Sequence, residues 1–291
     1  MNLEQLIYKR FSSSQELTRH LASFAGGPAV FSTQSPDLDR EEWGGNTQYP
    51  QVIYNIDMQA NEERESAGTL MVTLICQNTV EILPEAIVPE VKKCLRDVLL
   101  KPGEGSLYAF AEAGTENFSI EEKENGSIIG IKMRFDMFEY PNQETTDPDP
   151  IVAVNGYIKE LNSDCLVIGM DRIDDITEIS KAVPIIYCRN VSMDKGAETN
   201  TVVWMDSKIS IHIFCPDSEK RIKMVAVIAN QLSLAGEIAM LDHSPMTIKQ
   251  LQANYKSDIF KDGQILTTVH FGLLKYRQKK HRIVEVVNII H

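Results

Sequence analysis

One pattern of residues occurs twice in this chain and limits the folds that the chain can adopt. Ser207 to Asp217 (SKISIHIFCPD) alternates along its length as a strand does and ends at a Pro-Asp turn. From Lys220 the apolar residues recur every three or four positions, which predicts a helix with one buried stripe. That stripe comprises Ile222, Val225, Ile228, Ala229 and Leu232. Gly68 to Asn78 (GTLMVTLICQN) and Pro89 to Leu99 predict the same strand and helix earlier in the chain.

Four landmarks repeat in the same order at nearly constant separation, which indicates an internal duplication. The separations are 134 positions for Pro50 and Pro184, 139 for Cys76 and Cys215, 137 for Asn125-Gly126 and Asp262-Gly263, and 136 for Phe135 and Phe271. The last match extends over FDMFEY and FGLLKY, with Tyr140 opposite Tyr276.

The duplication predicts an α+β fold of two tandem similar modules, each a mostly antiparallel β-sheet packed by one or two helices. The N-terminal module is expected over residues 1–142 and the C-terminal module over residues 151–291. Residues 143–150, rich in proline and acidic side chains, are expected to form the linker, because such a composition continues neither a helix nor a sheet.

Local patterns predict the other elements. Helices are expected at Leu3 to Phe11 and Gln15 to Phe24, an exposed loop at Val30 to Gln48, and a proline-entered strand at Tyr49 to Asp57. Asn125-Gly126 predicts a hairpin turn, and Ala182 to Val191 predicts another strand. Thr247 to Lys256 is expected to be irregular or a short helix, followed by a last strand over Ile265 to Tyr276.

The charge of the chain argues against nucleic-acid binding. The 41 acidic and 29 basic residues give a net charge of −12, which repels a phosphate backbone. The basic run Lys275 to Arg282 is better interpreted as a solvated strand end than as a nucleic-acid site. No sequence-specific nucleic-acid partner is therefore expected.

Cysteine usage and hydropathy indicate a cytoplasmic protein. The five cysteines form no C-x-x-C pair and lie mostly among apolar residues, which predicts buried thiols in a reducing compartment. No window approaches the roughly 20 apolar residues of a membrane span, and MNLEQLIYKRF lacks the core of a signal peptide.

Sequence motifs for catalysis are missing. No two histidines are spaced as metal ligands, and no nucleophile elbow or phosphate-binding loop occurs. His212 and His270 fall on predicted strands, where a satisfied structural histidine is the simpler interpretation. Asp171, Asp174 and Asp175 lack the glycine and closing glutamate of a calcium loop and predict a solvated turn. No catalytic residue, cofactor or metal is therefore predicted, and the chain is not expected to be an enzyme.

The order of these elements resembles the tail terminator, or tail-completion, proteins of long-tailed bacteriophages. The proline-entered strands YPQVIY and VPIIYC carry this resemblance, and the segment SKISIHIFCPDSEKRIKMVAVIANQL is similar to the terminators of contractile-tailed phages. The resemblance implies a homo-oligomeric ring, commonly a hexamer, that caps the tail tube and offers a docking surface to the head. The implied partners are copies of the chain itself, tail tube and sheath proteins, and head-completion or neck proteins. The implied location is the host cytoplasm during assembly and then the virion, where DNA passes through the ring. Two modules in one chain depart from the common single-module form.

A ring subunit needs complementary surfaces rather than a pocket. The candidates for such contacts lie in the loop Val30 to Gln48 and in the charged turn Asp57 to Ser66. They are Trp43, Asp39, Arg40, Glu62, Glu63 and Arg64. For Trp43 the alternative is a loop anchor folded onto its own module.

Two other functions remain open at this point. The chain can be another head-tail connector, such as an adaptor or stopper, or a baseplate component. It can also be an enzyme with a site between the two modules, which requires polar residues to converge there.

Overall fold

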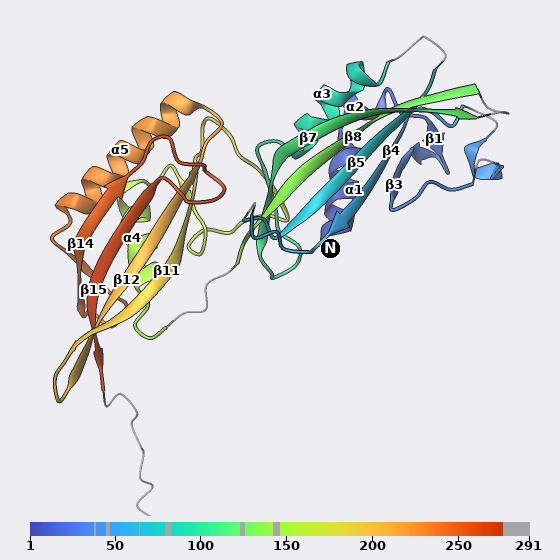
Figure 1. Ribbon diagram of the computed structural model, residues 1–291. Coiled ribbons are helices and arrows are strands. Elements are labelled where there is room, and N and C mark those ends of the chain that lie inside the picture. Colours follow the sequence, from blue (N-terminus) through green and yellow to red (C-terminus); the bar gives the residue numbers. More distant parts are fainter. Residues whose placement is uncertain are drawn as a thin grey trace, which may run out of the picture.

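The computed structural model describes residues 1–37, 39–44, 47–63, 65–78, 83–122, 126–141 and 146–275. Each half of the chain builds a curled sheet with helices packed on it (Figure 1). The fold is α+β with two similar modules, as the sequence predicts.

The N-terminal module holds the larger sheet. Its elements are helices α1 (Leu3–Ser13), α2 (Gln15–Thr18) and α3 (Pro84–Leu95), the 3-10 turn η1 (Glu41–Trp43), and strands β1 (Ser23–Phe24), β2 (Gly27–Pro28), β3 (Val30–Ser32), β4 (Gln51–Asp57), β5 (Gly68–Gln77), β6 (Val98–Leu100), β7 (Leu107–Glu122) and β8 (Gly126–Tyr140). The module's own strands in this sheet follow the order β6-β7-β8-β5-β4-β3, and every pair is antiparallel except β3 with β4.

The C-terminal module repeats this plan. Its elements are helices α4 (Pro150–Leu161) and α5 (Ser218–Leu234) and strands β9 (Leu166–Val167), β10 (Ile176–Glu178), β11 (Ile185–Glu198), β12 (Val202–Phe214), β13 (Glu237–Ala239), β14 (Pro245–Ala253) and β15 (Ile265–Leu274). The order is β13-β14-β15-β12-β11-β9, again antiparallel except for one pair, β9 with β11. Each strand therefore has a counterpart at the same place in the other sheet. The exceptions are β1 and β2, which pair with each other in a separate two-stranded sheet, and β10, which leaves its own module and pairs with β6.

The first two sequence landmarks mark equivalent positions. Val52 stands opposite Leu74, and Ile186 stands opposite Ile213, which keeps the separations of 134 and 139. The same separation of 139 positions relates the last residue of α3, Leu95, to the last residue of α5, Leu234. It also relates β6 to β13. This middle part of the two modules matches residue by residue.

The match between Phe135 and Phe271 is wrong in register. Phe135 stands opposite Leu70, whereas Phe271 stands opposite Met205. At a separation of 139, the counterpart of Leu70 is Ile209, four residues from Met205. Both phenylalanines still point into their cores, because a shift by an even number of residues keeps a side chain on the same face of a strand.

The connection before the last strand also differs between the modules. β7 and β8 form the predicted hairpin, with Glu122 opposite Gly126. In the C-terminal module residues 254–264 separate the paired ends of β14 and β15, so Asp262-Gly263 does not form a tight hairpin turn. Gly263 has φ +71°, and a Cβ there would lie 2.6 Å from the Ser210 Oγ. Asn125 and Tyr276 lie outside the described residues.

Helix α4 begins at Pro150, the last residue of the predicted linker. Pro150 is the first residue of this helix, where its missing N–H costs no hydrogen bond. The carboxylate of Asp149 caps the helix by accepting a hydrogen bond from the Ile151 N–H at 2.7 Å. Asn2 caps α1 in the same way. Residues 142–145 lie outside the described part of the chain.

Several other sequence predictions are corrected. The helix expected at Pro89 to Leu99 begins at Pro84 and ends at Leu95, and the buried run Val98–Leu100 is strand β6. The helix expected at Gln15 to Phe24 ends at Thr18. The segment expected to be irregular or helical at Thr247 to Lys256 is largely strand β14. The exposed loop expected from Val30 starts with strand β3.

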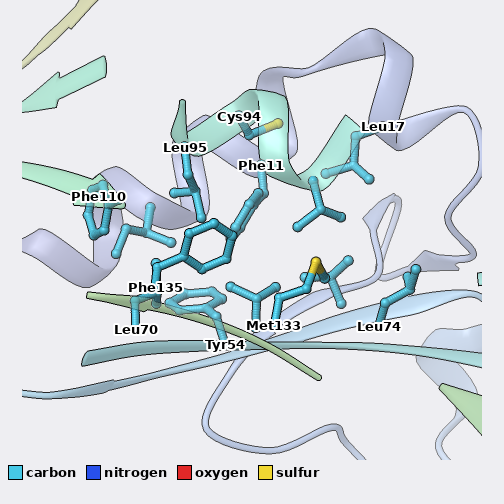
Figure 2. Packing of buried hydrophobic residues seen from close by; sticks show 14 of the residues in the cluster. Phe11, Leu17, Tyr54, Leu70, Leu74, Cys94, Leu95, Phe110, Met133 and Phe135 are labelled. Carbon is cyan, nitrogen blue, oxygen red and sulfur yellow. The ribbon is translucent and has the colours of Figure 1, made fainter. Parts of the chain in front are cut away.

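Each sheet buries one face against its helices. In the N-terminal core, Phe11 of α1 points toward Phe135 on the sheet, and Cys94 of α3 and Met133 belong to the same buried cluster (Figure 2). In the C-terminal core, α5 buries Val225, Ile228, Ala229 and Leu232. The predicted stripe is confirmed for these four residues but not for Ile222, which is 45% exposed.

Candidate assembly surfaces

The thiols of the chain are buried, as predicted. All five cysteines are buried and free of disulfides. Burial raises the pKa of Cys76 to about 12 and that of Cys165 to about 11, because a thiolate loses hydration in an apolar core. These thiols are in the wrong protonation state for a nucleophile at neutral pH.

His212 is a structural histidine. Its side chain is fully buried, and its Nδ1 lies 2.8 Å from the carbonyl oxygen of Ile259, to which the ring N–H donates. Desolvation lowers its pKa to about 4, so the ring is neutral at physiological pH. Within the described ranges no three His, Cys, Asp or Glu side chains cluster as metal ligands.

The predicted contact residues lie at two separate places. Asp39 and Arg40 are exposed on the loop between β3 and β4, and Glu62 and Glu63 are exposed on the turn between β4 and β5. That turn borders the C-terminal module, because its following residues line a cavity with Arg189 and Lys261. The loop after β3 lies at the other end of the N-terminal sheet (Figure 1). Arg64 lies outside the described residues.

Trp43 is a loop anchor rather than a contact residue. Its side chain is 2% exposed and packs edge-on against the rings of Phe24 and Phe31, at centroid distances of 4.8 and 5.8 Å. Its indole N–H donates a hydrogen bond to the carbonyl oxygen of Asp37 at 3.1 Å. Trp43 therefore holds the loop against its own module, and the exposed neighbours Asp39 and Arg40 are what the loop presents outward.

The two modules are joined by strand addition. β10 of the C-terminal module pairs antiparallel with β6, with Ile176 opposite Leu100 and Glu178 opposite Val98. Hydrogen bonds from Ile179 N–H to Asp97 O and from Lys101 N–H to Asp175 O, both 2.8 Å, continue the ladder on either side. Sequence patterns indicate no partner for Ile176 to Ile179, because the strand is short and its partner lies in the other half of the chain.

An aromatic cluster seals the same joint. Tyr140, at the end of β8, places its ring 5.2 Å from those of Tyr187 and Phe214 in the C-terminal module. Its hydroxyl donates to the carbonyl oxygen of Phe260 at 3.0 Å, and the Tyr187 hydroxyl donates to that of Pro141 at 2.9 Å. The buried rings and hydrogen bonds fix the modules to each other along the edge that β10 covers.

Three of the cavities open on the surface are lined entirely by described residues. One of about 310 Å³ lies at the joint, lined by Glu65, Ser66, Ala67, Phe138, Glu139, Arg189, Phe260 and Lys261. A second, of about 320 Å³, lies over the sheet of the C-terminal module and shares Arg189. The third, also about 320 Å³, lies between α4 and β13 and is mostly apolar.

The C-terminal module also extends a long hairpin. β11 and β12 run together beyond the packed part of the sheet and project from the module (Figure 1). Near its tip Glu198 is held by Lys195 and Lys275, which lower the pKa of its carboxyl to about 2. Trp204 stacks on His270 at a centroid distance of 4.9 Å. The equivalent connection in the N-terminal module is the charged turn between β4 and β5.

Comparisons with known proteins do not place the chain in a family. Among the described residues, no helix is both long and apolar enough to cross a membrane. No family model matches the sequence, and no curated protein is similar to it.

Proposed function

We propose that this chain is a structural subunit of a phage tail, a terminator that forms a ring on the tail tube and offers a docking surface to the head. The observation that carries the proposal is the way the two modules meet. A strand of one module extends the sheet of a second module of the same topology, so this fold uses its sheet edges for assembly. The resemblance of the sequence to tail terminators supplies the biological setting.

Electron microscopy of the purified protein tests this role. Rings are expected, and with tail tubes from the same phage they are expected at the tube end. Sedimentation should show an oligomer whose mass rises with concentration. A protein that stays monomeric at high concentration and ignores the tubes would contradict the proposal. Binding to head-neck proteins without binding to tubes would favour the adaptor or stopper alternative.

The cavity at the joint bears on the alternative that the chain is an enzyme with a site between the modules. Glu139, Arg189 and Lys261 meet there, which is where an enzyme with a site between the modules would need polar groups. Two of these groups already have structural roles. Glu139 accepts a hydrogen bond from the Tyr108 hydroxyl at 3.2 Å, and Arg189 donates to the Lys261 carbonyl oxygen at 2.5 Å. Under the assembly proposal, Glu139→Gln leaves ring formation and tube binding unchanged.

A further inference from the structure

The edge that joins the modules has an uncovered counterpart. β6 pairs with β7 on one side and β10 on the other. Its counterpart β13, 139 positions later, pairs with β14, and no other strand in the described part of the chain covers its far side. The backbone groups on that side of Glu237–Ala239 are therefore available to another strand.

An apolar groove accompanies this edge. Between α4 and β13 it is lined by Val152, Ala153, Gly156, Tyr157, Glu160, Met170, Ile238, Ala239, Met240 and Leu241. Leu241 is 69% exposed and Met170 is 48% exposed, so large apolar side chains face solvent beside the uncovered edge of β13. Such a combination is typical of a contact surface.

The N-terminal module shows what fills the equivalent place. The N-caps Asn2 and Asp149 align α1 with α4 at a separation of 147, which makes Arg10 the counterpart of Tyr157. Arg10 contacts β10, because its Nη1 lies 2.7 Å from the Glu178 carboxylate. Tyr157 lines the open groove. In the N-terminal module this position contacts an added strand, and in the C-terminal module it faces the groove where a strand would lie.

The topology identifies the segment that would fill the groove. β10 lies in the connection 168–184, which follows the parallel edge strand β9 and leads to β11. The same connection in the N-terminal module follows β3 and leads to β4, and its described residues are 33–37, 39–44 and 47–50. Strand β9 follows β3 by 137 positions, and β11 follows β4 by 134 positions. Subtracting these separations from position 176 gives 39 and 42, so the counterpart of Ile176 lies within Asp39 to Glu42.

The two surfaces cannot meet within one chain. In Figure 1 the β13 side of the C-terminal sheet lies at one end of the molecule, and the loop after β3 lies at the other. In Figure 1 the β7 side of the N-terminal sheet faces the C-terminal module, and the β14 side of the C-terminal sheet faces away from the N-terminal module, so the contact between modules can repeat head to tail. A heterologous contact of this kind closes into a ring when its rotation closes.

We infer that the β13 edge and the α4 groove bind the exposed part of the β3–β4 loop, at Asp39 and Arg40, of a second copy of this chain, at the place equivalent to the one where β6 binds β10. The inference deepens the proposed assembly function and rests on it for the association of copies. Because each chain has two modules, every assembly then contains an even number of modules. Equivalent edges, β6 within a chain and β13 between chains, join each module to the next. A ring of three chains would present six quasi-equivalent modules.

Charge substitutions in the groove test the surface. Leu241→Asp places a carboxylate among apolar groups at the contact, and it is expected to weaken self-association ~10-fold or more. Ile222→Asp is the matched control, because Ile222 is an exposed apolar residue on α5 away from β13. Both side chains are exposed, so both variants are expected to fold and to unfold at similar denaturant concentrations. Equal association constants for Leu241→Asp and the wild-type chain would overturn the inference.

Cross-linking between copies tests the occupant. One preparation carries Ala239→Cys and the other Arg40→Cys, and the five native thiols are buried. Mixing is expected to give a disulfide-linked dimer under mild oxidation, while Arg40→Cys mixed with Ile120→Cys on β7 is expected to give none.

The outcomes separate this inference from the proposed function. Rings that form on tail tubes without the specific cross-link would overturn the inference and leave the terminator role standing. A Leu241→Asp variant that keeps its rings but loses tube binding would show that the groove belongs to the tube protein, which also overturns the inference. A wild-type chain that remains monomeric overturns both.

Discussion

Arg10 and Glu178, from opposite halves of the chain, form an ion pair in which Arg10 Nη1 lies 2.7 Å from Glu178 Oε1. The pair connects the first helix of one module to the strand contributed by the other. Arg10 also donates through Nε to the carbonyl oxygen of Cys94 at 2.8 Å, near the end of α3. One guanidinium thus holds α1, α3 and β10 together at the edge where the modules join.

The two partners of this pair are expected to contribute unequally to stability. Glu178 is 68% exposed, so solvent screens its attraction, and Glu178→Gln should cost at most about 0.5 kcal/mol. Arg10→Ala also leaves the part-buried Cys94 carbonyl unpaired and should cost about 1–3 kcal/mol. Urea unfolding of both variants and of the double variant measures the difference and the coupling. Equal costs would contradict this assignment.

Tyr140 tests whether the two modules unfold as one unit. Tyr140→Phe keeps the ring in the aromatic cluster but removes the hydroxyl that bonds to Phe260 O, which should cost about 1 kcal/mol. Because the cluster joins both modules, we expect one shifted unfolding transition by calorimetry, not two. Tyr8→Phe is the control, since its side chain is exposed and lies outside the cluster. Two separate transitions in the wild-type chain would show that the joint does not couple the modules.

The sequence predicts the local plan well and the contacts between modules poorly. The sequence predicts β5 and the part of β12 from Ser207 onward, because their alternation is regular and their ends are marked by Asn78 and Pro216. β14 was missed because a bulge between Ile248 and Gln250 breaks the alternation, which leaves apolar residues at mixed spacings. β10 directly follows the turn predicted at Asp171, Asp174 and Asp175, and the sequence pattern predicts no strand there because nothing near it indicates its partner.

The interaction candidates show the same limit. Charge and turn composition identify Asp39, Arg40, Glu62 and Glu63 as exposed, and the structure places them on the surface. Composition does not show that the two segments occupy different ends of the module, nor that Trp43 turns inward. The uncovered β13 edge becomes visible only by comparison with β6, since a strand edge is defined by its neighbours and not by its own residues.

Trp43 should affect the stability of the N-terminal module more than it affects assembly directly. Trp43→Phe retains part of the packing against Phe24 and Phe31 but loses the hydrogen bond to Asp37 O, and it should cost about 1–3 kcal/mol. The measurement is urea unfolding together with sedimentation at matched fractions of folded protein. A variant of unchanged stability that no longer associates would show that Trp43 is itself a contact residue.

His212 predicts that the fold weakens as pH falls from about 6.5 toward 4. Its folded pKa is about 4 and its unfolded value is near 6.5, so the unfolded chain binds the extra proton in this window. The stability from the neutral ring is complete above the unfolded pKa, and about 3 kcal/mol of it is lost once the pH reaches the folded pKa.

His212→Gln keeps a donor for the carbonyl of Ile259 and removes the titration, so its unfolding free energy should depend less on pH in this range. The hydrogen bond from Lys249 lowers the pKa of Asp206, so the stability that this carboxylate contributes is lost at a lower pH. Asp206 is present in both proteins and therefore does not account for a difference between them. The measurement is urea unfolding at pH 7.5, 6, 5 and 4.5, and the same slope in both proteins would show that His212 is not the titrating group.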